Sequence, residues 1–448
     1  MVTPNSALDV VMAREYERAA REQFLDPETE RNFSPTVGFE TEYSLVKSGG
    51  TELVTQEVRD QIVAHDSSLM SQELGAGQLE VKSQPLDLME SGFEGLEDHL
   101  IACEQGAVSA ASEHDAELVR IGGYPLQSVH QIIRSNSQRY QQVVSWHNAN
   151  RNKTVPTFIG ALKRTHPTTA EIIALMNSVQ FNLAMRSAKQ GVKLLNLSFA
   201  LLPSIIAISG NSRFVDKVDT KYSDTRMLLW EMTHDTRSTI ERITNAPARV
   251  GLPNTYFADI QTYIKYVSGQ PFIMNKPDTA FEVGTGLTWS DARLKIKDNR
   301  ILLEFRPLSI QPSVQEDVAL FAFYIGLIEY YLVNERILPP IQVVSTNRYN
   351  AMRYGLGAEF TQIDEDGTAF QVPAAEVIAA DLNKAKIGLR MAGFEGGVER
   401  LEILDRRLQR MRAPSDDLAD YVDRQQAAGL SYEEALISAV RARVVKSE

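Results

Sequence analysis

Four short segments of this chain place acidic or amide side chains on alternate residues of a predicted β-strand, and this pattern constrains the fold most. The segments are 38–43, 77–81, 178–183 and 302–306. Side chains at positions i and i+2 of a strand point to the same face of a sheet. Each strand therefore has one face with a polar pair: Glu40 with Glu42, Gln78 with Glu80, Gln180 with Asn182, and Glu304 with Arg306. The residues between them, such as Phe39 and Phe305, are apolar and form the opposite face.

Such strands predict an α+β fold. We expect a curved, mainly antiparallel sheet with a polar active-site face, and helices that cover its other, apolar face. Helical periodicity predicts helices at 8–24, 91–115 and 189–208, the last kinked or interrupted at Pro203. From about residue 374 the chain has the pattern of helices with charged faces, so we also expect a helical C-terminal portion.

The composition excludes several classes of protein. A formal net charge of −12 argues against binding to nucleic acid or to an anionic membrane surface. The single cysteine, Cys103, can form no intrachain disulfide, and its apolar helical surroundings favour a core position. The most apolar long segment, 318–333, contains Glu329 and is too short to span a membrane. The N-terminus has no basic and apolar signal sequence, so we expect a cytoplasmic protein.

The polar strand faces suggest a site for hard cations. Carboxylate and amide oxygens are the ligands that Mg²⁺ or Mn²⁺ prefers. A single alternating strand more often marks a solvated face, but four of them between residues 38 and 306 favour a shared cation site. The seven histidines lack zinc-ligand spacing, and the chain has no phosphate-loop motif.

Arginines form the second candidate group. Arg306 shares a strand face with Glu304, and Arg226 and Arg237 lie in one short region with Trp230. Guanidinium groups bind carboxylate and phosphate groups through two parallel hydrogen bonds. The alternative for any single arginine is a surface ion pair.

Together, these motifs resemble the glutamate–cysteine ligases of the plant and bacterial type, and related carboxylate–amine ligases of the glutamine synthetase-like superfamily. The resemblance covers roughly residues 36–335, in which the motifs keep the family's order and spacing. The motifs are 38–43, 73–80 with 83–85, 178–182, 202–203 with 210–212, the residues Ser223, Arg226, Trp230, Asp235 and Arg237, a basic turn at 292–295, and 303–308. We expect an N-terminal helix in 1–35, a glutamine synthetase-like catalytic domain in 36–340 and a helical C-terminal region in 341–448.

The resemblance implies an enzyme that uses ATP to phosphorylate a carboxylate, in this family the γ-carboxyl of glutamate. An amine then attacks the acyl phosphate to form an amide. By resemblance, two or three Mg²⁺ (or Mn²⁺) ions are held by Glu40, Glu42, Glu80, Gln180, Asn182 and Glu304. The implied catalytic residues are Arg226 and Arg306, on the transferred phosphoryl group or the acceptor carboxylate, with Arg237 as a second such contact. The expected substrate-binding residues are Arg139, Asn211, Trp230 and Arg293.

The expected partners are small-molecule carboxylate and amine substrates, with monomer and homodimer both open. Two loops depart from the family pattern. The chain reads Asn-Ser-Arg-Phe at 211–214 without the family's proline and glycine-rich turn, and 281–291 lacks its histidine and Phe-Pro segment. Two alternatives therefore stay open. One is a tailoring ligase with another acid or amine, for a specialised metabolite or a peptide, and the other is a noncatalytic descendant that binds nucleotide or a partner protein.

Overall fold

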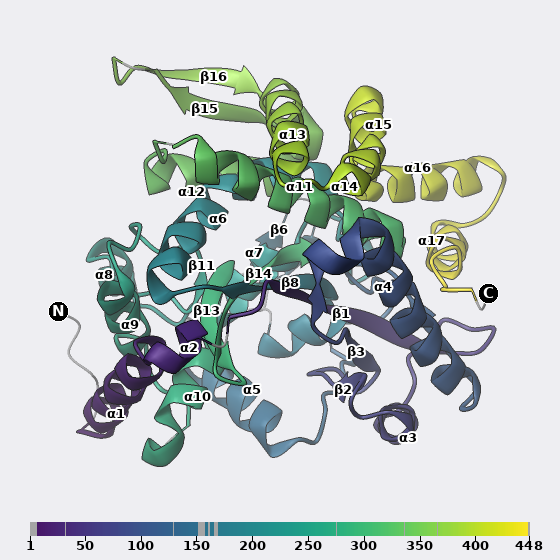
Figure 1. The fold of residues 1–448 in the computed structure, drawn as a ribbon. Coiled ribbons are helices and arrows are strands. Elements are labelled where there is room, and N and C mark those ends of the chain that lie inside the picture. The colour runs from purple at the N-terminus through teal and green to yellow at the C-terminus, as the bar shows by residue number, and fades with distance from the viewer. Residues whose placement is uncertain are drawn as a thin grey trace.

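The computed structural model describes residues 7–446 except 32, 129, 151–156, 160–161, 165–168, 275, 336 and 365. Its centre is a curved antiparallel sheet in the strand order β13-β14-β8-β1-β3-β2, with β4 and β5 also paired to β1 (Figure 1). The strands are β1 (Thr36–Lys47), β2 (Met70–Gln72), β3 (Gln78–Lys82), β4 (Leu86–Asp87), β5 (Ala116–Val119), β8 (Ser178–Met185), β13 (Ala292–Lys297) and β14 (Arg300–Ser309). The predicted α+β fold is confirmed, and each of the four alternating segments forms a strand of this one sheet.

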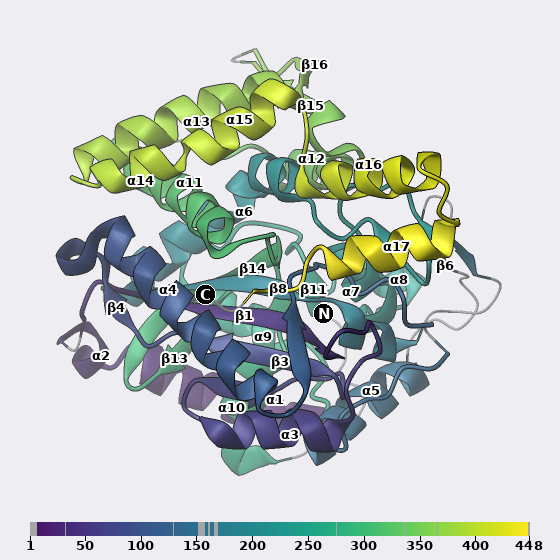
Figure 2. The same cartoon turned by 90° about the vertical axis from the view of Figure 1, so that its right-hand side faces the viewer.

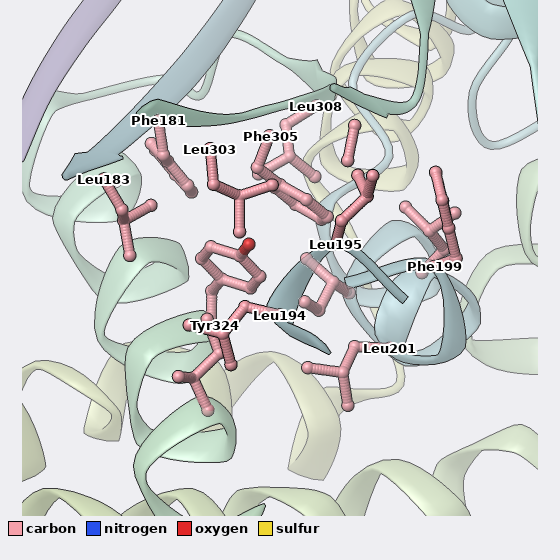
Figure 3. Close-up of a cluster of buried hydrophobic side chains, with 14 of the residues drawn as sticks. Phe181, Leu183, Leu194, Leu195, Phe199, Leu201, Leu303, Phe305, Leu308 and Tyr324 are labelled. Carbon is pink, nitrogen blue, oxygen red and sulfur yellow. The ribbon is translucent and has the colours of Figure 1, made fainter. Parts of the chain in front are cut away.

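Helices cover the apolar face of the sheet. α6 (Ala188–Ser209), α11 (Val314–Val333) and α13 (Ala374–Met391) stack above the strands in Figures 1 and 2. Side chains of α6 and α11 interleave with the apolar strand residues, and α13 packs on α11. The rings of Phe305 and Tyr324 stack with centroids 4.3 Å apart. Figure 3 shows Tyr324 of α11 among the strand residues and the leucines of α6. Burying aromatic side chains of this size is worth roughly 1.5–3 kcal/mol each, so this core fixes which face of each strand remains polar.

The helix predicted over 189–208 is α6, and the interruption expected as one alternative at Pro203 is wrong, because α6 continues through this residue. The apolar segment 318–333 lies in α11. Among the described residues, only α6 has the length and composition of a membrane span. Of its most apolar stretch, 94% is buried inside the fold. Tight packing on every side stabilises α6 and outweighs the backbone hydrogen bond that proline removes.

The N-terminal helix packs beside the polar side of the sheet. α1 (Ala7–Phe24) contacts α9 (Ile260–Ser268) and α10 (Ala280–Gly286). Tyr16 stacks on Phe281 with centroids 5.8 Å apart. The segment 292–295, expected as a basic turn, is part of strand β13, where its alternating basic residues join the polar face.

The long helix α4 and a set of shorter elements complete this part of the fold. They are α2 (Pro27–Arg31), α3 (Gln56–His65), α4 (Leu88–Ser112), α5 (Gln138–Asn150), β6 (Thr157–Ile159), β7 (Leu162–Arg164), η1 (Ala170–Leu175), β9 (Phe214–Val215), β10 (Val218–Asp219), α7 (Arg226–His234), α8 (Thr239–Ile243), β11 (Val250–Gly251), η2 (Pro277–Thr279) and β12 (Trp289–Ser290). Cys103 is half-buried on α4 and packs against a cluster of buried apolar side chains that includes Leu79 of β3 and Ala107 of α4.

The C-terminal region is helical, as predicted, with one added hairpin. It comprises α12 (Ile341–Tyr354), η3 (Gly355–Gly357), β15 (Glu359–Ile363), β16 (Ala369–Pro373), α13, α14 (Glu395–Arg400), α15 (Glu402–Arg410), α16 (Pro414–Ala427) and α17 (Tyr432–Arg441). The chain returns to the sheet at its end, where Val445 N donates to Leu118 O at 2.8 Å. The boundary at residue 340 stays a prediction.

Candidate active site

The polar side chains form one continuous row across the sheet because the strand register aligns them. Glu304 of β14 lies opposite Asn182 of β8 on one side and Arg293 of β13 on the other. Glu40 of β1 lies opposite Gln180 of β8. Segments more than 200 residues apart in sequence thus contribute to the same surface.

A cavity of about 360 Å³ opens over this row. Its walls combine acidic, basic and aromatic side chains. Of the residues predicted from sequence, it is lined by Glu40, Glu42, Glu80, Gln180, Arg139, Trp230, Arg293 and Arg306. It is also lined by residues that the sequence analysis did not name as site residues, among them Glu73, Tyr140, His234 and Trp289.

Three carboxylates gather at one end of the cavity. One oxygen from each of Glu42, Glu73 and Glu80 lies within 4.8 Å of the others. Ser71 Oγ donates to Glu80 at 2.8 Å, and the main-chain N–H of Ser178 donates to Glu42 at 2.7 Å. These hydrogen bonds fix the carboxylates, and Lys82 Nζ, 3.3 Å from Glu80, offsets the charge of one of the three.

Burial in this cluster makes ionisation unfavourable. Desolvation, followed by repulsion from Glu40, raises the pKa of Glu80 to about 7. Desolvation and the neighbouring Glu80 raise the pKa of Glu73 well above its ordinary value, and burial also raises the pKa of Glu42. A divalent cation removes this repulsion, and a set of three carboxylate oxygens suits Mg²⁺ or Mn²⁺. The cluster therefore fits the predicted ion site.

The sequence analysis did not name Glu73 as a site residue, because its segment, 73–77, is a loop between β2 and β3 and has no strand alternation. The only signal in the sequence is its place at the start of the acidic motif 73–80. Tyr140 of α5 donates to Glu73 Oε2 at 3.3 Å, so a residue from a distant helix fixes its position.

The resemblance implies that Glu304 is a metal ligand, but in the structure its carboxylate is paired with three basic side chains. Lys295 Nζ donates to it at 2.5 Å, Arg306 at 2.8 Å, and Arg293 also donates to it. Although burial opposes ionisation, these three cations hold the pKa of Glu304 well below its usual range. In this structure Glu304 is a buried anion that orders the basic side of the site.

The two amide residues link the acidic and basic sides. Gln180 donates from Nε2 to Glu42 at 3.2 Å and accepts a hydrogen bond from Arg306 through Oε1. Asn182 Nδ2 donates to Glu40 at 3.3 Å, while its Oδ1 is buried without a partner among the described residues. An orphaned amide oxygen beside a carboxylate is consistent with a second cation position.

Arg226 lies behind the row and does not line the cavity. Its Nη1 donates to the main-chain oxygen of Arg306 at 2.9 Å, and its charge attracts that of Glu42. Arg226 is therefore placed to position Arg306 and not to reach a substrate directly.

Like Arg226, Asn182 and Glu304, the predicted site residues Asn211 and Arg237 do not line the cavity. Asn211 is buried and donates from Nδ2 to Ile310 O at 2.6 Å. Arg237 pairs with Asp235 at 2.9 Å and donates to Ala246 O at 2.9 Å. Both side chains are used to hold loops together, so this structure does not support direct substrate contacts by either.

This chain is similar to known proteins in sequence and in fold. The model of glutamate-cysteine ligase family 2 matches residues 36–438. The chain belongs to this family. A family protein from Rhodopirellula baltica, described as "Putative glutamate--cysteine ligase 2", is 24% identical over 377 residues, which cover 82% of this chain and 88% of that protein.

Solved structures share the fold of this family member. The crystal structure of a glutamate–cysteine ligase from Francisella tularensis in complex with AMP has a TM-score of 0.58 at 12% identity, covering 92% of this chain and 88% of that one. A bifunctional glutathione synthetase from Pasteurella multocida has a TM-score of 0.55 at 11% identity, covering 97% of this chain and 54% of that one. The family membership and the shared fold support a ligase of the glutamate–cysteine ligase kind.

Proposed function

We propose that this chain is an ATP- and Mg²⁺-dependent ligase that joins a glutamate-type γ-carboxylate to an amine. The observation that carries the proposal is that one cavity is lined by both a carboxylate cluster and three arginines. The cluster is Glu42, Glu73 and Glu80, and the arginines are Arg139, Arg293 and Arg306.

The two sides of the cavity have complementary tasks in phosphoryl transfer. Glu42, Glu73 and Glu80 would hold Mg²⁺, which when bound offsets the negative charge of the ATP phosphates. Arg306 is fixed by Glu304 and Gln180, so its guanidinium keeps one orientation toward the cavity. A pre-oriented guanidinium stabilises charge on a transferred phosphoryl group without reorganising during the reaction.

The chemistry then follows in two steps. A carboxylate oxygen of the acid attacks the γ-phosphorus of ATP, the bond to ADP breaks, and an acyl phosphate forms. The amine nitrogen attacks the acyl carbon, the bond to phosphate breaks, and an amide and inorganic phosphate result. Arg139 and Arg293 line the same cavity and suit the carboxylate groups of the acid.

A second candidate is a tailoring ligase with the same chemistry and another amine. The aromatic end of the cavity favours it, since the rings of Trp230 and Trp289 lie 5.3 Å apart and both line the wall. This wall and the segment 281–291, which departs from the family pattern and forms most of α10 and β12, are where a different amine side chain would be accommodated.

The test is ADP release with Mg·ATP across a panel of acids and amines, with mass spectrometry of the products. We expect release that depends on one acid and one amine, with a product of condensed mass. Glu73→Gln should lower the rate by more than roughly 100-fold, because a lost metal ligand removes several kcal/mol of charge stabilisation. Glu52→Gln is the matched control, since Glu52 is an exposed partner of Lys47 far from the cavity in the fold. No ADP release with any acid, or an equal effect of both variants, would contradict the proposal.

A further inference from the structure

His234 lines the aromatic end of the cavity but has no role in the phosphoryl-transfer chemistry described above. It is the last residue of α7 and is only 1% exposed. Its ring lies 4.5 Å from that of Trp230 and 5.3 Å from that of Trp289, measured between centroids. Behind it, the ring of His147 on α5 lies 4.3 Å away.

The hydrogen bonds around His234 determine which ring nitrogen carries the proton. Thr233 Oγ1 donates its only hydrogen to Leu229 O at 2.6 Å. The 2.8 Å contact between Thr233 Oγ1 and His234 Nδ1 must therefore have Nδ1 as the donor. The neutral ring then has an unprotonated Nε2, and none of the described residues donates a hydrogen bond to it.

The surroundings keep this imidazole neutral. Burial, then the nearby His147 and Arg249, hold the pKa of His234 well below its ordinary value. His147 has the same tautomer, because its Nδ1 lies 2.7 Å from Val143 O, a group that only accepts. Burial and Arg249 lower the pKa of His147 to about 3, so neither ring is protonated at neutral pH.

We propose that the end of the cavity formed by Trp230, His234 and Trp289 is the subsite for the amine substrate, and that His234 Nε2 accepts the amine's proton. This inference rests on the proposed ligase function. An unprotonated ring nitrogen in a buried wall requires an N–H or O–H donor, and the electron-rich faces of two tryptophans favour positive charge. The attacking amine brings an N–H on the reacting nitrogen and develops new positive charge there during the reaction, whereas the ammonium charge of a glutamate-type acid does not change.

The proton transfer completes the second chemical step. When the neutral amine attacks the acyl carbon, its nitrogen becomes four-bonded and positively charged. His234 Nε2 takes one proton from that nitrogen as phosphate leaves, which gives the neutral amide and an imidazolium ring. The imidazolium returns the proton to the released phosphate or to water, so the enzyme is restored. The charged nitrogen is more acidic than a free ammonium group, and the buried ring, whose surroundings disfavour the imidazolium, holds the proton only until the departing phosphate or water accepts it.

Hydroxylamine separates this role from the rest of the reaction. It is small, nucleophilic and largely unprotonated at neutral pH, so it captures an acyl phosphate without a general base. We expect His234→Phe, which keeps the ring packing, to lower kcat for the natural amine by roughly 100-fold or more. Formation of the hydroxamate with ATP, the acid and hydroxylamine should remain close to that of the wild type.

His147→Phe is the matched control, because His147 is equally buried and stacked against His234 but does not line the cavity. We expect it to retain amide synthesis. In His234→Ala, added imidazole should restore part of the amide rate, which a purely structural role does not predict.

The outcomes are distinct. Loss of amide and hydroxamate formation to the same extent in His234→Phe, with no rescue of His234→Ala by imidazole, would overturn the role of His234 and leave the ligase function standing. Absence of hydroxamate formation by the wild-type enzyme would overturn the proposed function and this inference with it.

Discussion

Glu42 and Glu80 lie directly opposite each other in the antiparallel pairing of β1 and β3. Two like charges at such cross-strand positions destabilise a sheet. The fold nevertheless places a third carboxylate, Glu73, within 4.8 Å of both. A cluster of this kind is stable only when a proton or a cation offsets the repulsion between the carboxylates. We therefore expect the stability of the protein to depend on pH and on Mg²⁺.

The first prediction concerns pH in metal-free buffer. The folded-state pKa of Glu80 is about 7, above its value of about 4.3 in an unfolded chain. The folded protein therefore binds more protons than the unfolded chain between these values, and stability falls as the pH rises from about 4.3 to 7. This loss of stability amounts to about 4 kcal/mol, and Glu80→Gln should avoid it because it removes the carboxylate.

Thermal unfolding in the presence of a chelator tests whether the Glu80 carboxylate destabilises the folded protein at high pH. Glu80→Gln should melt at a higher temperature than the wild type at pH 8 and at a similar temperature at pH 5. A variant that is less stable than the wild type at pH 8 would show that the ion pair of Glu80 with Lys82, whose Nζ lies 3.3 Å away, outweighs the burial and the repulsion.

The second prediction concerns Mg²⁺. At pH 7.5 added Mg²⁺ should raise the melting temperature, because the ion binds the folded cluster and not the unfolded chain. Saturation at about 100 times the dissociation constant corresponds to about 2.7 kcal/mol. Glu73→Gln should weaken this response, whereas Glu52→Gln should keep it; an unchanged response in Glu73→Gln would place the ion elsewhere.

The third prediction separates two roles of Glu304. Glu304→Ala leaves Arg293, Lys295 and Arg306 without their shared anion, and breaking a buried ion pair in this way costs about 3–5 kcal/mol. Melting temperatures of Glu304→Ala and Glu304→Gln measure the effect, with the smaller loss expected for glutamine, which still accepts hydrogen bonds. Unchanged stability together with a lost Mg²⁺ response would instead restore Glu304 as a metal ligand.

The fourth prediction tests the contact between α11 and α13. A Cβ atom on Gly326 would lie 2.5 Å from Ala385 O on α13, so Gly326→Ala forces the two helices apart. Overpacking of this kind costs about 1–3 kcal/mol. Gly396→Ala on α14 is the control, since its Cβ would make only ordinary contacts, with Phe93 Cβ at 3.7 Å and Arg400 Nη1 at 3.9 Å. Equal stability of the two variants would contradict the close approach of the helices.

Much of the fold could be predicted because the signal is local. Alternation identified β1, β3, β8 and β14, and the shared face of Glu40 and Glu42 follows directly from the strand geometry. The uninterrupted path of α6 through Pro203 could not be predicted, because it depends on burial by neighbours that are distant in sequence.

Fewer features of the site could be predicted, because they depend on contacts between segments that are distant in sequence. Alternation shows that Glu304 faces the site, but it does not show that β13 brings Arg293 and Lys295 to the same carboxylate. Glu73 and His234 belong to a loop and a helix end, where no period marks the direction of a side chain. Their positions depend on Tyr140 and Thr233, contacts that exist only after folding.

The central claim is that an acyl phosphate forms, and oxygen transfer tests it most directly. The acid selected by the substrate panel is labelled with ¹⁸O in its reacting carboxylate and incubated with Mg·ATP and the amine, and the phosphate is analysed by mass spectrometry. The proposed chemistry predicts one ¹⁸O atom in each inorganic phosphate released, because that oxygen leaves with the phosphoryl group. Unlabelled phosphate, or ¹⁸O found in AMP, would contradict it.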